Sequence, residues 1–370
     1  MKVLIKECKK IMDIRVLLVL AVFTVLFYQL FLEVTIYPMG GQTTDSKYDM
    51  PFYAELMESW GASLPREDWP KLDEKRKELE GAYSRIIAAD PVLVDAGITN
   101  YQEFSKTQEI LFDKETLTDQ EKEINQELSR LVFDDSKGAK LFFELQVLDH
   151  LEQYRDLQNS DSISLMPDGI FYIVEKDMRM MGILLLICFV ILVLPYLIRE
   201  RLCHVLPLYA ATATGRKIFD RQFQGIFVCC GLVGIVQFAV YVFVYVKKGL
   251  AIFWKGDCSN DAVQFWCKNL PFGVYMLLHI LLVLVVALAA VVFLYMIARA
   301  AGNYIAGIAL AIPTCIGIGF LLTHIFVHLF QKPVEENGLP YVEVFWILGW
   351  ILVCVCVLWR KMHRDHYRDL

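Results

Sequence analysis

Two pairs of side chains have types and spacings that could do chemistry. His324 and His328 lie four residues apart, so a helix would place both imidazoles on one face, where they could chelate a metal ion. No carboxylate or thiolate lies near them at a recognisable spacing, which favours ordinary polar contacts inside a helix bundle and no metal site. Cys258 and Cys267 share one short loop. A disulfide between them would stabilise the fold by about 2–3 kcal/mol in the chain-entropy model, and the alternative is two free thiols.

The patterns that would indicate an enzyme are missing from the sequence. No G-x-x-x-x-G-K-[ST] run occurs, so this chain is not expected to bind ATP through a Walker motif. The acidic block described below contains one histidine, His150, and no Ser/His/Asp or Cys/His constellation. We therefore expect no catalytic residue and no cofactor on this chain.

Acidic and apolar residues are concentrated in different parts of the chain. Of its 370 residues, 56% are apolar and 21% are charged, a mixture that indicates apolar membrane helices beside a polar domain. Residues 38–178 contain 15 Lys/Arg and 30 Asp/Glu, a net charge of −15, and since the whole chain carries −6 the remainder carries +9. None of the 10 cysteines lies in this acidic block. Its residues, about 140 in number, are enough for a core without disulfides.

Apolar stretches of the length that a bilayer requires predict six transmembrane helices. A hydrocarbon core about 30 Å thick needs roughly 20 helical residues. The stretches are 16–36, 180–198, 225–246, 272–297, 304–330 and 343–359. The first is too long for a signal-peptide core and has no small-residue cleavage site, so we interpret it as a retained signal anchor. The predicted fold class is an all-α polytopic membrane protein with a mainly α-helical extracellular domain, residues 37–178, inserted after the first of six spans.

Lysine and arginine residues set the orientation of these spans. Cations gather before the first span, between the second and third, between the fourth and fifth, and after the last. They are Lys2, Lys6, Lys9, Lys10, Arg15, Arg199, Arg201, Arg216, Lys217, Arg221, Arg299, Arg360, Lys361, Arg364 and Arg368. With six spans, all these segments fall on one side, which the positive-inside rule makes the cytoplasm. The sequence thus predicts a multi-pass membrane protein with both termini cytoplasmic.

The predicted extracellular domain has helical signals throughout. Apolar residues form one stripe over 65–89, and leucines recur at helical spacing over 137–157. Two capping-box patterns, Thr99…Gln102 and Thr118…Glu121, mark further helix starts, and no alternating strand run is found. Its acidic surface is interpreted as a solvated face, and the alternative is a docking surface for a cationic peptide or an envelope component.

The predicted spans contain no ionisable group near the middle of the bilayer. Glu33 lies near the outer end of the first span and Glu343 opens the last, while the deeper polar residues are Gln29, Gln237 and His279. Ion-coupled transporters need such groups to bind and release the driving ion. A proton- or sodium-driven cycle is therefore not expected, and energy would have to come from a partner.

Residues 1–15 and 199–224 are the segments most unlike ordinary loops. In the first, Leu4, Cys8 and Ile11 alternate with lysines, which predicts an amphipathic helix along the inner membrane interface, in contact with lipids. The second reads R-E-R-L-C-H-V-L-P-L-Y-A-A-T-A-T-G-R-K-I-F-D-R-Q-F-Q. It has a charged pair, an apolar stretch, a Thr-Gly-Arg turn and then a basic amphipathic run.

This order resembles the cytoplasmic loop of type-two ABC exporter permeases, which in low-GC Gram-positive bacteria commonly reads Glu, then Ser/Thr-Thr-x-x-Gly-Arg, then a basic helix. One departure is Arg221, where relatives often have lysine. The N-terminal M-K-V-L-I-K-E-C-K-K-I is similar to the interfacial helix of that family. One span, a large extracellular domain and five further spans also match one of its subgroups.

The resemblance implies a permease subunit in the plasma membrane of a bacterium. It would pair with a second permease chain, identical or different, and with a separate cytoplasmic ABC ATPase that binds ATP and Mg²⁺. The inner loop and N-terminal helix would dock onto that ATPase. The coupling residues implied are Glu200, Arg201, Gly215, Arg216, Lys217 and Arg221. The alternative function is an ATPase- or kinase-coupled mechanotransmitter that moves the extracellular domain without transporting a solute. No nucleic-acid partner is expected.

Overall fold

The chain folds into two compact units, described here from a computed structural model. The structure describes residues 2–36, 44–114, 116–134, 136–158, 162–203, 213–258, 267, 270–330 and 340–367. The first unit, called the bundle unit, comprises Met1–Ile36, Ile170–Lys248 and Ser259–Leu370. The second, called the inserted unit, comprises Tyr37–Gly169 and Gly249–Cys258. The inserted unit therefore ends earlier than the predicted range 37–178 and also includes part of the loop at 247–271.

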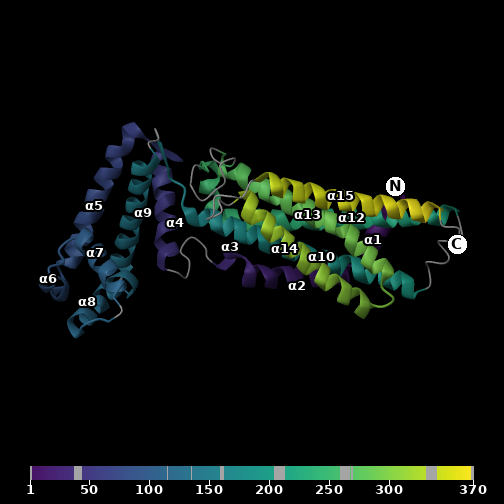
Figure 1. Ribbon diagram of the computed structural model, residues 1–370, viewed down its shortest axis with the longest axis horizontal. Helices are drawn as coiled ribbons and strands as arrows, with labels where there is room; N and C mark the ends of the chain where they lie inside the picture. Colours follow the sequence, from purple (N-terminus) through teal and green to yellow (C-terminus); the bar gives the residue numbers. More distant parts are fainter. Residues whose placement is uncertain are drawn as a thin grey trace. The chain divides into compact units, whose positions relative to one another are not determined.

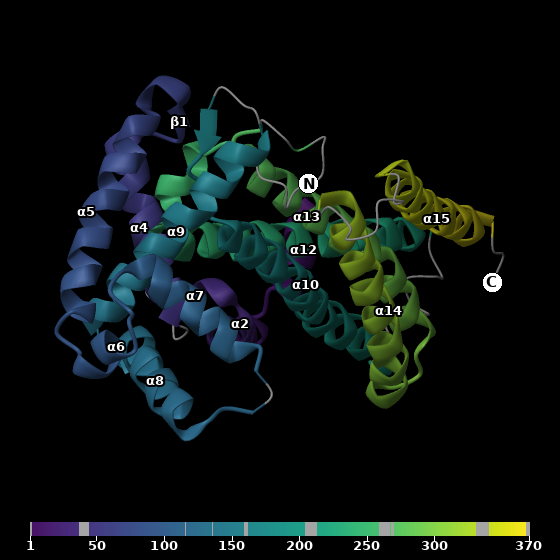
Figure 2. The ribbon, with the colours of Figure 1, turned by 60° about the vertical axis from the view of Figure 1, so that its left-hand side comes forward.

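The bundle unit is built mainly from long apolar helices, together with the shorter α1 and α3 (Figures 1 and 2). They are α1 (Lys2–Ile11), α2 (Ile14–Phe31), α3 (Glu33–Ile36), α10 (Asp168–Leu202), α12 (Ala213–Lys247), α13 (Phe272–Ala300), α14 (Tyr304–Phe330) and α15 (Pro340–Tyr367). In the described part of the chain, five helices are long and apolar enough to cross a membrane, namely α2, α10, α12, α13 and α14. Within α15 the apolar stretch is shorter, Phe345–Val357. The chain is thus a predominantly helical protein of the polytopic membrane class.

Several helix boundaries differ from the predicted spans, among them the end of the first and the start of the second. The first span was predicted to run to residue 36, but α2 ends at Phe31 because Leu32 adopts an extended backbone (φ −94°, ψ 124°), and the short α3 follows. The second span was predicted to begin at residue 180, whereas α10 begins at Asp168. The charged run Glu175–Arg179 comes before the apolar stretch and set the predicted start of the span. The helix nevertheless continues through this run, because its residues are compatible with helical backbone.

Most of the apolar stretch of α10 is buried, a larger share than in the other four long apolar helices. Glycines bring its neighbours close. A Cβ on Gly182 would lie 2.9 Å from Leu322 of α14, and one on Gly307 of α14 would lie 2.8 Å from Ile198 of α10. Small residues at helix contacts are the usual means of close packing between membrane helices. Most of α2, by contrast, is exposed.

The inserted unit is mainly helical and also contains a small sheet. Its elements are α4 (Thr44–Trp60), β1 (Ser63–Pro65), η1 (Arg66–Asp68), α5 (Trp69–Ile87), α6 (Pro91–Asp95), α7 (Tyr101–Phe112), α8 (Asp119–Ser129), η2 (Arg130–Asp134), α9 (Ser136–Gln158), β2 (Ser162–Ser164) and η3 (Leu250–Lys255). β1 and β2 pair antiparallel with Leu64 opposite Ile163. The prediction of a mainly α-helical domain agrees with this unit, and the two strands were not predicted because three-residue strands are too short to show an alternating pattern.

Aromatic side chains fill the core between α5, α7 and α9. The ring of Tyr83 lies edge-on to that of Phe104, with centroids 5.3 Å apart, and Phe142 packs against both. On the predicted stripe of the 65–89 helix, Leu72, Leu79 and Tyr83 are buried as expected. Edge-to-face packing of this kind adds to the apolar area that aromatic residues bury.

One predicted helix cap is confirmed and the other is displaced by a residue. Thr118 and Glu121 form a full capping box at the start of α8. At α7 the N-cap is Asn100, whose side chain accepts a hydrogen bond from the Glu103 N–H at 2.9 Å. The predicted pair Thr99…Gln102 is therefore wrong. Thr99 instead precedes the cap and donates its backbone N–H to the Glu103 carboxylate at 2.7 Å.

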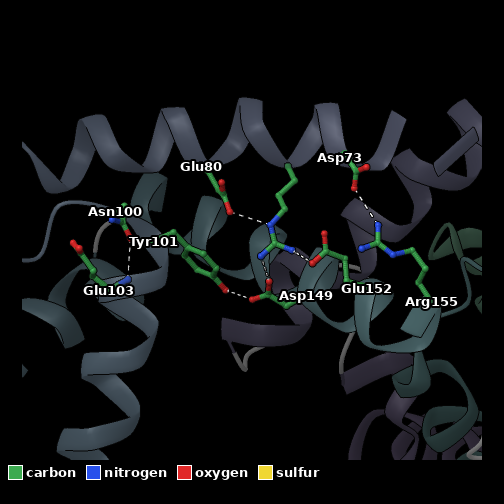
Figure 3. A network of polar contacts seen from close by, with 9 residues as sticks. Asp73, Glu80, Asn100, Tyr101, Glu103, Asp149, Glu152 and Arg155 are labelled. Carbon is green, nitrogen blue, oxygen red and sulfur yellow. Dashed lines mark hydrogen bonds and ion pairs between the residues drawn. The ribbon is translucent and has the colours of Figure 1, made fainter. Parts of the chain in front are cut away.

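A charged network joins α5 to α9 (Figure 3). Arg76 on α5 is within hydrogen-bond distance of Glu80 at 2.9 Å and also bonds Asp149 and Glu152 of α9. Tyr101 of α7 donates its hydroxyl to Asp149 at 2.6 Å. Burial, followed by the Asp149 carboxylate, raises the pKa of Tyr101. One guanidinium thus balances three carboxylates at the meeting point of three helices.

We expect Arg76→Leu to lower the free energy of unfolding of the inserted unit by about 1–3 kcal/mol, because three carboxylates would then face one another without a cation. Urea unfolding of the full-length protein, followed by pulse proteolysis, measures the change. Arg85→Leu on the same helix is the matched control, since the exposed Arg85 bonds only its own helix backbone at Gly81 among the described contacts. Equal effects of the two substitutions would contradict the prediction.

The stability that the α8 cap contributes to the fold should depend on pH. The Lys114 ammonium, followed by the Thr118 backbone N–H, lowers the pKa of Glu121 to about 2. A glutamate in the unfolded chain has a pKa of about 4.3. Ionised Glu121 therefore stabilises the fold above that pH, and this contribution is lost as the pH falls toward 2. The stability difference between wild type and Glu121→Gln should therefore be full at pH 7 and shrink at pH 3. Glu123→Gln is the control, and a difference that does not change with pH would refute this assignment.

Candidate functional site

Polar side chains from three helices meet at one end of the bundle unit. We call Glu7 and Lys10 of α1, Tyr196 and Glu200 of α10, and Gln222 of α12 the polar junction. Lys10 Nζ lies 2.8 Å from Glu7 Oε1 and 3.7 Å from Glu200 Oε1. Tyr196 donates its hydroxyl to Glu7, and Gln222 donates its side-chain amide to Glu200. The junction thus brings the N-terminal helix together with Glu200, one of the predicted coupling residues.

The packing of α1 on α12 turns Glu7 toward this junction. Leu4, Glu7 and Ile11 share one helix face and lie nearest to Gly225 of α12. A Cβ on Gly225 would be 3.4 Å from the Glu7 Cβ, so the absence of a side chain there allows the close approach. Cys8 reinforces the contact, since its thiol lies 3.9 Å from the Gly225 carbonyl oxygen.

Arg201 fastens α10 to the end of α13. Its Nη1 donates to the carbonyl oxygens of residues 299, 300 and 301, at 3.0, 3.1 and 2.8 Å. These carbonyls belong to the C-terminal turn of α13, where the helix dipole favours a cation. The Arg299 guanidinium in turn lies 4.3 Å from the centre of the Phe219 ring on α12. Three helices are therefore connected through two arginines.

The remaining predicted coupling residues lie apart from the junction or beyond the described side chains. Arg221 is exposed and bonds Gln224 at 2.9 Å. The turn predicted at the Thr-Gly-Arg sequence is wrong, because α12 begins at Ala213 and the backbone of Gly215, Arg216 and Lys217 is already helical. The side chains of these three residues lie outside the described part of the structure, and so does the segment 204–212.

A second polar centre lies where α2 gives way to α3. Asp177 of α10 is fully buried and accepts hydrogen bonds from the backbone N–H groups of Glu33 and Val34, the second at 3.0 Å. The Tyr241 hydroxyl of α12 donates to the same carboxylate at 3.2 Å. Lys176 forms an ion pair with the Glu33 side chain. This Asp177 centre ties α3 to α10 and α12.

The sequence interpretation overlooked Glu175 and Asp177 because they precede the apolar window of the second span. Both are buried in the bundle unit, and Glu175 accepts a hydrogen bond from Tyr275 of α13 at 3.0 Å. The bundle unit therefore contains buried ionisable groups that lie outside the predicted spans. The feature that could have revealed them is the helical pattern of 168–180, which runs without a break into the apolar stretch. Charged residues in such a helix are rarely left unpaired. Glu7, Tyr196 and Gln222 were also missed, because no local pattern distinguishes them.

Two polar residues of α2 also contact α12. Tyr28 donates its hydroxyl to the Gln237 carbonyl oxygen at 2.8 Å, and the Gln237 side-chain amide donates to the Thr24 hydroxyl at 2.7 Å. Gln237 was predicted to be a deep polar residue, and the structure gives it a specific partner. Hydrogen bonds between helices of this kind contribute about 0.6–2 kcal/mol each inside a membrane.

The cysteine and histidine pairs gain no chemical role from the structure. Cys258 belongs to the inserted unit and Cys267 to the bundle unit, both are buried, and their bridge stays a prediction. Burial raises the pKa of the Cys267 thiol to about 12. His324 is exposed on α14, and the side chain of His328 lies outside the described residues. Among those residues, no three His, Cys, Asp or Glu side chains are placed to hold a metal ion.

Comparison of the chain with family models, curated proteins and solved structures gave no match. The function is therefore inferred from the sequence resemblance and from the geometry of the polar junction and the Asp177 centre.

The packing at Gly225 can be tested by side-chain size. Gly225→Ala should be tolerated, whereas Gly225→Leu should displace α1, because overpacking a close helix contact costs about 1–3 kcal/mol. Hydrogen exchange of residues 2–11 in the full-length protein reports the displacement. Gly231→Leu is the matched control on the same helix, since nothing lies within 4 Å of a Cβ built there. If both leucine variants leave exchange in α1 unchanged, the assigned contact is wrong.

Proposed function

We propose that this chain is the membrane-spanning permease subunit of an ATP-driven ABC exporter, which couples a separate cytoplasmic ATPase to substrate movement across the membrane. In this proposal α15 contributes a sixth span and the inserted unit is extracellular. Both termini face the cytoplasm of a bacterial cell, and a second permease chain completes the pathway. ATP and Mg²⁺ bind the ATPase and not this chain.

The observation that carries the proposal is the polar junction. It joins the N-terminal helix to the residues that flank the inner loop, through Lys10, Glu200 and Gln222. A partner that pushed on either α1 or the loop would therefore move both, together with the helices that Arg201 connects. This arrangement suits a docking region, because force applied at one surface reaches α10, α12 and α13 at once.

A second candidate is a mechanotransmitter that moves the inserted unit without transporting a solute, and the Asp177 centre favours it. α3 leads directly into the inserted unit and α10 leads directly out of it. Asp177 and Lys176 hold these two segments together through the Glu33 and Val34 backbone and the Glu33 side chain. A displacement of α10 would thus be passed to both chain connections.

The two functions share one prediction. The protein purified from its native membrane should bring down a P-loop ATPase, and Arg216→Ala or Glu200→Gln should lower the ATP hydrolysis of the complex by about 5–150-fold, the usual range of coupling between sites. Arg85→Ala in the inserted unit is the control and should leave hydrolysis unchanged. Absence of any co-purifying ATPase would remove the basis of the exporter proposal and of an ATPase-coupled mechanotransmitter, and would leave only a kinase-coupled one.

A measurement of substrate transport distinguishes the exporter from the mechanotransmitter. In proteoliposomes that contain the complex, an exporter should move a labelled peptide or lipid across the membrane in an ATP-dependent way that Arg216→Ala abolishes. ATP hydrolysis that depends on Arg216 without any flux would favour the mechanotransmitter.

A further inference from the structure

The charge on the outward face of α1 is entirely positive, because the one carboxylate of the helix points inward. Glu7 is 5% exposed and bonds Tyr196 and Lys10, whereas Lys6 and Lys9 are exposed on the opposite side of the helix. Within the described part of the chain, neither Lys6 nor Lys9 has an ion-pair partner. Two ammonium groups three residues apart, and so on one side of the helix, therefore point away from the protein.

Apolar side chains flank these lysines. Val3 is 48% exposed and Ile5 is 49% exposed, although α1 already buries Ile11 and part of Leu4 against α12. A helix on a water-facing surface would gain nothing from these residues. A basic face with exposed aliphatic flanks is the composition of helices that lie in a membrane interface.

The connection to α2 sets the depth of α1. Only Met12 and Asp13 separate the two helices, and Asp13 caps α2 by accepting the Arg15 N–H at 3.0 Å. From its first turn, α2 exposes large apolar side chains, with Ile14 67% exposed and Leu18 60% exposed. Because those side chains require acyl chains around them, α1 lies where the acyl region ends and the head groups begin.

We propose that this face of α1 binds the head groups of anionic phospholipids. Lys6 and Lys9 would pair with the lipid phosphates, whose negative charge is not balanced by a cation in a phosphatidylglycerol-type head group, while Val3 and Ile5 would enter the upper acyl region. The lysine stems reach along the apolar surface while their ammonium groups remain among the head groups. Charge complementarity selects anionic over zwitterionic lipid, with each lysine near such a surface contributing about fivefold in affinity.

The proposal can be tested on the full-length chain alone, without ATPase, so its outcome is independent of the transport proposal. The protein is placed in nanodiscs of phosphatidylcholine, or of phosphatidylcholine with about three-tenths phosphatidylglycerol, a composition rich enough to give an anionic surface. Hydrogen exchange of peptide 2–13 is then compared. Protection of α1 should rise with phosphatidylglycerol and fall again at high salt. Lys6→Gln with Lys9→Gln should reduce that gain by up to about 25-fold, at fivefold per lysine.

Lys71→Gln with Lys122→Gln is the matched control, because both are exposed lysines on helices of the inserted unit. It should keep the full response to phosphatidylglycerol. Val3→Ser with Ile5→Ser should lower protection in both lipid compositions, and unchanged exchange in α12 verifies that the variants are folded. Equal protection of wild-type α1 in the two lipids would overturn the proposal. So would equal protection by inorganic phosphate in phosphatidylcholine discs, which would indicate a soluble anion.

Discussion

Inside a helix bundle that excludes water, every interruption of a helix leaves backbone N–H groups that need a partner, and this chain interrupts its first long helix at Leu32. The carboxylate of Asp177 supplies that partner for Glu33 and Val34. A buried carboxylate is itself costly unless several donors surround it, and Tyr241 provides the third. The break in α2, the path of α3 and the positions of α10 and α12 are therefore set by one side chain.

The same rule operates at the polar junction. Glu7 could not be buried between α1 and α12 without Tyr196 and Lys10, and Glu200 in turn shares Lys10 and is bonded by Gln222. Loss of one member would leave a buried polar group unsatisfied, which costs more than the net gain of forming an average hydrogen bond. The junction thus specifies where α1 lies, while its outward lysines remain available to the surroundings.

Much of the fold could be predicted from the sequence, whereas the details of the site could not. Apolar stretches predicted six spans, and among the described residues five of the corresponding helices are long and apolar enough to cross a membrane. Span length can be read from the sequence because it depends only on a continuous stretch of residues. The capping box at Thr118 was predictable for the same reason, since its partners are three residues apart. Asp177, Glu7 and Gln222 depend on pairings between distant segments, so their roles became visible only when the helices were placed together. At Gly215 the turn was wrongly predicted, because helix propensity near a span end outweighed one glycine.

Polar contacts also explain how the N-terminal part of the chain is held to the rest. Between membrane helices the hydrophobic effect gives little drive, since lipid is as apolar as the side chains. Most of α2 is exposed, and three sets of contacts attach this part of the chain: α1 on α12, Tyr28 and Thr24 with Gln237, and α3 with Asp177. Only the last of these sets involves α10, the most buried of the five long apolar helices, but Glu200 of α10 also belongs to the polar junction that holds α1. Asp177 and Glu200 lie 23 residues apart on α10, a span of about 35 Å at 1.5 Å per residue. A shift of α10 along its axis would therefore act on both ends of the N-terminal segment at once.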